Sequence, residues 1–122
     1  YALCAGTGIA DDRYGIFLFG GDRGTTFHQV ESLLAEIGRE PDPAKKQQLT
    51  EKKNELQLHH PGFSAGMLKY SFRKNKWRVC TTLPFTIPVT THASYADGLI
   101  CIPGGEIRAG VRTAQVITGT LK

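Results

Sequence analysis

The sequence predicts an all-β fold of antiparallel repeated units, with a helical insertion inside the first unit. The evidence is an apolar run that ends in a glycine pair at two places, residues 16–21 and 99–105, and a helix-forming stretch after the first of them. A short apolar run is typical of a buried strand, and a glycine pair allows a sharp backbone turn where a Cβ atom has no room. The recurrence indicates a repeated supersecondary unit.

The first unit contains four expected strands, and in the last two of them apolar and polar residues alternate. This alternation gives each strand one apolar face, and a Lys74–Asn75 turn joins the two strands as a hairpin. The four strands are expected at residues 2–8, 15–20, 67–73 and 76–82.

The first helix of the insertion follows a change of composition after Gly24, where Leu, Ala, Glu, Lys and Gln become frequent. Thr26 followed by Gln29 is a capping-box pattern, and Gly38 is placed to end the helix. The apolar residues that recur at helical spacing in between are Phe27, Val30, Leu33, Leu34 and Ile37.

A second helix is expected to begin with Asp42 as its cap and Pro43 in its first turn, and to end at about Leu58. Its apolar residues form only a thin stripe. The sequence therefore predicts that this helix lies on the surface.

The pattern restarts after the hairpin, with strands expected at residues 91–95, 99–102 and 113–118 and with no fourth strand. An apolar run, a glycine pair, and then Tyr70 and Trp77 with six residues between them resemble the kelch repeat, which forms one four-stranded blade of a β-propeller. The resemblance implies a first blade at residues 1–83, with the helical insertion at about 25–60, and a second, incomplete blade at 84–122. Because propellers close with about 4 to 8 blades, we expect the chain to be a fragment and the remaining blades to be its partners.

Charge is uneven along the chain. Residues 22–60 carry six Lys/Arg and seven Asp/Glu, a net charge of −1, and the other residues carry nine and four, a net charge of +5. The cations have no aromatic stacking motif among them, so we expect solvated sheet faces and no nucleic-acid partner, although a site for a small anion is compatible with this charge.

No apolar run is long enough to span a membrane, and no membrane is expected as a partner. Cys4, Cys80 and Cys101 have no C-x-x-C spacing and are expected to be buried free thiols.

The residues with the strongest chemical signal follow the second glycine pair, where Gly105–Glu106 precedes Arg112–Thr113 by six residues. In a kelch blade that follows a blade with a helical insertion, this motif resembles the N-acetylneuraminate epimerase (sialic acid mutarotase) family. The resemblance implies that Glu106 is the proton acceptor and that Arg112 belongs to the active site. It also implies an isomerase in the full-length parent, with N-acetylneuraminate as substrate, and a periplasmic location. The fragment alone is expected to be inactive.

The chemistry of mutarotation agrees with these roles. A proton must leave the anomeric hydroxyl as the ring oxygen gains one, and a nearby carboxylate such as Glu106 can move it. The substrate also carries a carboxylate on its anomeric carbon, which the Arg112 guanidinium can grip through two parallel hydrogen bonds. This chemistry requires no metal and no organic cofactor.

Strand alternation predicts which other residues approach this pair, because loops that follow even-numbered strands share one face of a blade. That face would carry the helical insertion, the link at residues 83–91 and the Glu106 loop. Arg23 and His92 are thus predicted to bind substrate. The competing interpretations are an ion pair between Glu106 and Arg112, a turn-shaping role for Arg23, a polar strand residue at His92, and a non-catalytic kelch module that binds a protein partner.

Overall fold

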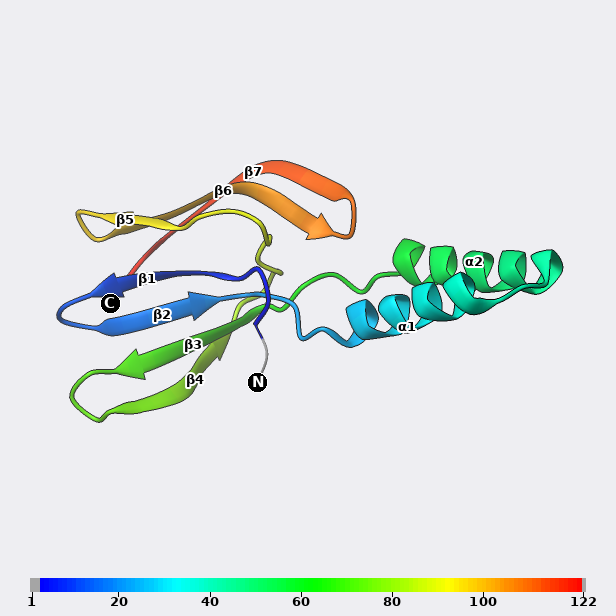
Figure 1. Ribbon diagram of the computed structural model, residues 1–122. Helices are drawn as coiled ribbons and strands as arrows, with labels where there is room; N and C mark the ends of the chain where they lie inside the picture. Colours follow the sequence, from blue (N-terminus) through cyan, green and yellow to red (C-terminus); the bar gives the residue numbers. More distant parts are fainter. Residues whose placement is uncertain (1–2, 122) are drawn as a thin grey trace. The chain divides into compact units, whose positions relative to one another are not determined.

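The computed structural model describes residues 3–121 and divides the chain into a β unit, Tyr1–Arg23 with Gly62–Lys122, and a helical unit, Gly24–Pro61. The β unit contains one sheet of order β1-β2-β3-β4 and one of order β5-β6-β7, both antiparallel (Figure 1). The predicted fold class is confirmed, including two helices between the second and third strands. The strands are β1 (Thr7–Asp11), β2 (Gly15–Phe19), β3 (Gly66–Ser71), β4 (Lys76–Thr82), β5 (Ser94–Ala96), β6 (Leu99–Arg108) and β7 (Val111–Thr120).

The first strand lies later in the chain than predicted, at Thr7–Asp11 instead of residues 2–8. Ala2 lies outside the described residues, and Cys4 forms only an isolated bridge to Asp22. The reason is the tight turn before Gly15, whose positive φ of 107° starts β2 directly opposite Asp11. The hairpin partner of a strand is fixed by its turn, and this turn pairs β2 with residues 7–11.

The other strands of the first sheet follow the prediction closely. β3 is shorter than predicted because it ends at Ser71, and β4 has the predicted bounds. Tyr70 lies directly opposite Trp77, with ring centroids 5.2 Å apart, and Asn75 has a φ of 49° in the turn. A cross-strand aromatic pair of this kind stabilises a hairpin.

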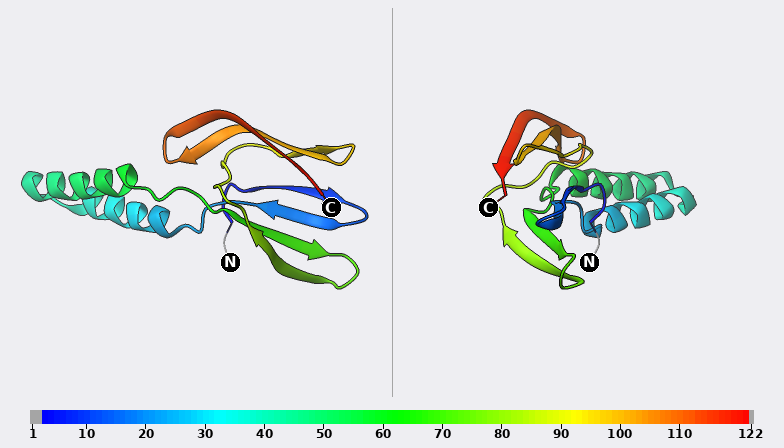
Figure 2. Two further views of the ribbon diagram at one scale, coloured as in Figure 1. Left: turned by 180° about the vertical axis from the view of Figure 1, so that it is seen from behind. Right: turned by 90° about the vertical axis from the view of Figure 1, so that its left-hand side faces the viewer.

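The core of the β unit lies between the facing sides of the two sheets, which approach most closely along β1 and β5 (Figures 1 and 2). In β2, Phe17 and Phe19 point into this core, whereas Ile16 and Leu18 belong to the opposite face. The buried core residues are Ile9, Phe17, Phe19, Ile87, Ile100 and Ile102.

Both glycine pairs lie against the link between the sheets, the first directly after β2 and the second inside β6. A Cβ atom on Gly20 would lie 2.7 Å from the Cβ atom of Ile87, and one on Gly105 would lie 2.7 Å from the carbonyl oxygen of Val89. Both glycines also have positive φ, 64° and 112°. The predicted lack of room for a Cβ atom is therefore observed at both pairs, and the link is the neighbour that fills the space.

The first helix, α1 (Thr25–Arg39), differs from the prediction at both ends. Its N-cap is Gly24 in a left-handed conformation with no side-chain cap, so the predicted capping box of Thr26 and Gln29 is wrong. Gly38 lies inside the helix and does not end it. Glu40 is extended, as expected for a residue before proline, so Pro41 explains the helix end better than Gly38 does.

The second helix, α2 (Pro43–Leu58), has the predicted cap and bounds. The Asp42 side chain accepts a hydrogen bond of 3.0 Å from the backbone N–H of Ala44, and Pro43 lies in the first turn. None of its residues is buried, as its thin apolar stripe predicted. In α1 only Val30 and Leu33 are buried. Neither helix is both long and apolar enough to cross a membrane.

The cysteines are free, as predicted, but they are less buried than expected. Cys4 is exposed, and Cys80 and Cys101 are half-buried. The reason is their position, since Cys4 lies outside the strands and Cys101 alternates with the core residues of β6 and so belongs to the outer face.

Asp11 joins the β1–β2 turn to the second sheet and is expected to make stability depend on pH. Its carboxylate accepts backbone hydrogen bonds from Tyr14 (2.9 Å) and Arg13 (2.8 Å) and one from the Tyr95 hydroxyl. The Tyr14 bond is the main cause that holds the pKa of Asp11 below its ordinary value of 3.8. A lowered pKa in the folded state means that the stabilisation is complete above the unfolded pKa and is lost as pH falls through the folded one.

Asp11→Asn should therefore lower the urea midpoint at pH 7 and have a smaller effect at pH 3, below the ordinary pKa of 3.8, where part of the stabilisation has already been lost. Urea unfolding at both pH values measures this. Asp12→Asn is the matched control, because it removes a neighbouring charge but none of these hydrogen bonds. An equal loss of pH dependence in both variants would contradict the role of Asp11.

Candidate functional site

Glu106 and Arg112 lie opposite each other on neighbouring strands. The sequence placed Glu106 in a loop after a strand ending at residue 102, but β6 continues to Arg108 and β7 begins at Val111. This correction has a clear physical reason. The register shifts between Pro103 and Gly105, where Gly104 lies opposite two residues of β7, and the two strands then resume pairing.

The remaining strands of the second sheet also differ from their predicted bounds. The first is short, at Ser94–Ala96 instead of residues 91–95, and the third is longer, at Val111–Thr120 instead of residues 113–118. Thr91 is kept out of the first strand because its hydroxyl donates to the carbonyl oxygen of Pro103 (2.6 Å). The long β6–β7 ribbon that results carries both candidate residues.

Glu106 is fixed by both its backbone and its side chain. Its N–H and C=O each form a hydrogen bond of 2.9 Å with the backbone of Val89 in the link between the sheets. One carboxylate oxygen, Oε1, accepts a hydrogen bond of 2.8 Å from the N–H of Gly110 in the β6–β7 turn. The side chain is half-buried. Its other carboxylate oxygen makes no hydrogen bond to a residue of the described chain.

Arg112 is the Cα partner of Glu106 and is exposed. Its Nη1 atom lies 3.5 Å from the hydroxyl oxygen of Thr90, which is at the limit of a hydrogen bond. Within residues 3–121 it forms no ion pair with Glu106. The guanidinium is thus held only loosely, and most of its five donors are available to a ligand.

The link at residues 83–91 is what brings these groups together. Besides its bonds to Glu106, it bonds to the segments that precede β1 and β3. The backbone N–H of Thr90 donates to the carbonyl oxygen of Ala5 (3.2 Å), and that of Ile87 donates to the carbonyl oxygen of Ser64 (3.3 Å). Thr90 has a φ of 55°, uncommon for a residue other than glycine. Sequence reasoning placed the link near Glu106 but missed Thr90 and Gly110 as direct contacts.

The structure does not connect the other two candidates to this pair. Arg23 is exposed and follows the first glycine pair, and His92 is exposed and lies just before β5. Among the described residues, neither hydrogen-bonds to Glu106 or Arg112. Their role in substrate binding stays a prediction.

The fold is like that of a solved structure, that of YjhT. The two structures agree with a TM-score of 0.70 at 13% sequence identity, and the match covers 95% of this chain and 33% of the YjhT chain. No protein-family model matches the chain, and no curated protein matches it. The likeness shows a kelch-like propeller fold, of which the two sheets and the helical insertion form a part. The chain spans about a third of the length of YjhT.

The arrangement can carry out two kinds of chemistry. A carboxylate with one oxygen anchored and the other uncommitted can accept and return a proton at a fixed position. An exposed guanidinium on the neighbouring strand can hold a second, anionic group of the same ligand. Together they suit a small molecule that bears a carboxylate beside an exchangeable hydroxyl.

Proposed function

We propose that the full-length parent of this chain interconverts the α and β anomers of N-acetylneuraminate. The observation that supports this most strongly is the register of the β6–β7 ribbon, which makes Glu106 and Arg112 direct cross-strand partners. The motif resembles that of the sialic acid mutarotase family, and the chain shares the fold of YjhT.

In the proposed mechanism, Arg112 binds the substrate carboxylate and so places the anomeric hydroxyl beside Glu106. The free carboxylate oxygen of Glu106 accepts the proton of that hydroxyl as the bond between the anomeric carbon and the ring oxygen breaks, and the resulting carboxylic acid gives the proton to the ring oxygen, which becomes a hydroxyl group. After rotation about the bond next to the new carbonyl carbon, the Glu106 carboxylate takes the proton back from this hydroxyl as its oxygen attacks the other face of the carbonyl, and the new anomeric hydroxyl receives that proton. The hydrogen bond from Gly110 keeps the carboxyl group in place through both steps.

Arg112→Lys tests the binding role. Lysine keeps the positive charge but cannot form two parallel hydrogen bonds to a carboxylate. We expect about tenfold weaker binding of N-acetylneuraminate by the parent protein, equivalent to about 1.4 kcal/mol, with a smaller change in the rate at saturating substrate. Isothermal titration calorimetry measures the affinity. Unchanged affinity would remove Arg112 from the binding site.

A non-catalytic kelch module is the second candidate. The observation that favours it is a structural role of Glu106, whose side chain accepts a hydrogen bond from the backbone N–H of Gly110 in the β6–β7 turn. The two candidates are separated by the rate of anomer exchange in the parent protein, followed by proton NMR from freshly released α-anomer. Only an enzyme raises this rate above that of buffer.

A further inference from the structure

The β3–β4 hairpin contains an unusual concentration of positive charge. Its ten residues from 69 to 78 hold five of the chain's 15 Lys/Arg and none of its 11 Asp/Glu. The local net charge of +5 therefore exceeds the +4 of the whole chain. The five cations are Lys69, Arg73, Lys74, Lys76 and Arg78.

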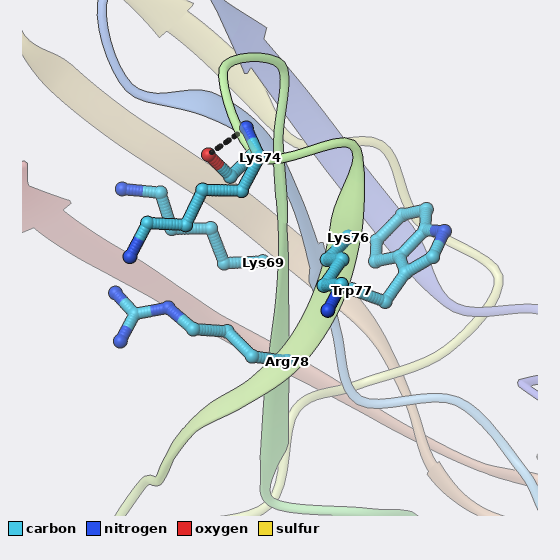
Figure 3. Close-up of a pocket in the computed structure, with 6 residues that line it drawn as sticks. Lys69, Lys74, Lys76, Trp77 and Arg78 are labelled. Carbon is cyan, nitrogen blue, oxygen red and sulfur yellow. Dashed lines mark hydrogen bonds between the residues drawn. The ribbon is translucent and has the colours of Figure 1, made fainter.

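Strand register gathers most of these cations on one face. Lys69 lies opposite Arg78, and Ser71 lies opposite Lys76, so all four side chains belong to the face that carries Phe17. They line a pocket of about 380 Å³ together with Lys74 and Trp77. Figure 3 shows the charged ends of Lys69, Lys74 and Arg78 extending to the same side of the hairpin.

The framework of this pocket is held by local contacts. The Lys69 ammonium lies 5.0 Å from the ring centroid of Phe17 and 5.6 Å from that of Tyr14, within the range of cation–π attraction. The Ser71 hydroxyl accepts a hydrogen bond of 3.3 Å from the backbone N–H of Lys74 (Figure 3). Lys69 and the hairpin turn beside the pocket are therefore held in place before any ligand binds.

No carboxylate compensates these charges. None of the six lining residues is acidic, and none of them forms an ion pair with another residue of the described part of the chain. Like charges directly opposite on neighbouring strands, such as Lys69 and Arg78, destabilise a sheet. A bound anion would relieve this repulsion.

We propose that the β3–β4 hairpin binds a small ligand through a multiply charged oxyanion, a phosphate or sulfate group. Lysine supplies point charges and Arg78 can bind two oxygens at once, which suits a tetrahedral group with several charged oxygens. A single carboxylate would satisfy only part of the site. The hairpin turn and the β6–β7 turn lie at opposite ends of the β unit (Figure 1), so this site is separate from Glu106 and Arg112 and does not rest on the proposed function.

Trp77 makes binding directly measurable, because it lines the pocket and is the chain's only tryptophan. We expect a saturable change in its fluorescence on titration with inorganic pyrophosphate or a sulfated disaccharide at about 20 mM ionic strength, where screening is weak. The two titrations distinguish the phosphate source from the sulfate source. N-acetylneuraminate, with one carboxylate, should bind at least about tenfold more weakly than the better of the two.

The decisive comparison uses two double variants, each of which removes two positive charges. Lys69→Gln with Arg78→Gln should weaken binding at least about tenfold, whereas Lys45→Gln with Lys46→Gln, on α2, should change it less than about twofold. Lys74→Gln, in the turn, provides a second test if the strand variant unfolds, which circular dichroism would show. If both double variants weaken binding equally, the effect comes from net charge alone and the proposed site is wrong. The proposal is also overturned if neither pyrophosphate nor the sulfated disaccharide gives a saturable fluorescence change.

Discussion

Glu106→Gln in the parent protein should lower the rate of anomer exchange by roughly 10²- to 10⁴-fold, the usual contribution of general acid–base catalysis, and leave substrate binding nearly unchanged. Glutamine is the appropriate replacement. Its carbonyl oxygen can still accept the hydrogen bond from Gly110, so the β6–β7 turn is kept. Its amide, however, cannot take up the proton of the anomeric hydroxyl.

Asp97→Asn is the matched control for this variant, because it removes one carboxylate from the turn at the other end of the second sheet (Figure 1). Asparagine also tolerates the φ of 50° found at that position. Exchange should continue at the wild-type rate in Asp97→Asn. If Glu106→Gln also exchanges the anomers at the wild-type rate, Glu106 is not the proton acceptor.

Gly105→Ala should destabilise the β unit by about 3 kcal/mol, the second large effect that we expect. About 1 kcal/mol comes from the positive φ, and the rest from a Cβ atom placed 2.7 Å from a backbone oxygen of the link, which has to move. Chemical denaturation followed by circular dichroism measures the free energy of unfolding. Gly20→Ala, against Ile87, should give a loss of similar size.

Gly110→Ala separates the cost of the positive φ from the cost of the close Cβ contact. Gly110 also has a positive φ, 74°, but an added Cβ atom would meet nothing within 4 Å. Its replacement should cost only the backbone term, about 1 kcal/mol. Equal losses for Gly105→Ala and Gly110→Ala would mean that the link does not press against the glycine pair.

Sequence patterns predicted the elements better than their ends. The alternation of apolar and polar residues in the hairpin predicted the strands in which Tyr70 and Trp77 are observed to pair. The Asp42–Pro43 cap predicted the start of α2. The end of α1 was misplaced because a glycine within a helix costs only about 1 kcal/mol relative to alanine, which tertiary contacts can offset. A nearby proline, Pro41, was the stronger signal.

The sequence predicted a Glu106 loop, whereas Glu106 and Arg112 are partners within one β ribbon. A glycine pair after an apolar run is equally compatible with a turn and with a bulge, and local sequence does not distinguish them. The register shift lies at Gly104, and the neighbouring Gly105 packs against the link at residues 83–91, which is not adjacent to it along the chain. The cationic pocket was not predicted because its cations come from two strands and a turn and gather only through the β3–β4 register, although cations at residues 69, 76 and 78 already indicate one face of a hairpin.

The protein that contains this chain should accelerate the mutarotation of N-acetylneuraminate. Proton NMR tests it directly, by following the anomeric equilibrium after enzymatic release of the pure α-anomer, with and without the full-length protein. We predict an exchange rate that rises in proportion to protein concentration and that is lost in Glu106→Gln. A rate equal to that of buffer alone, at every protein concentration, would contradict the proposed function.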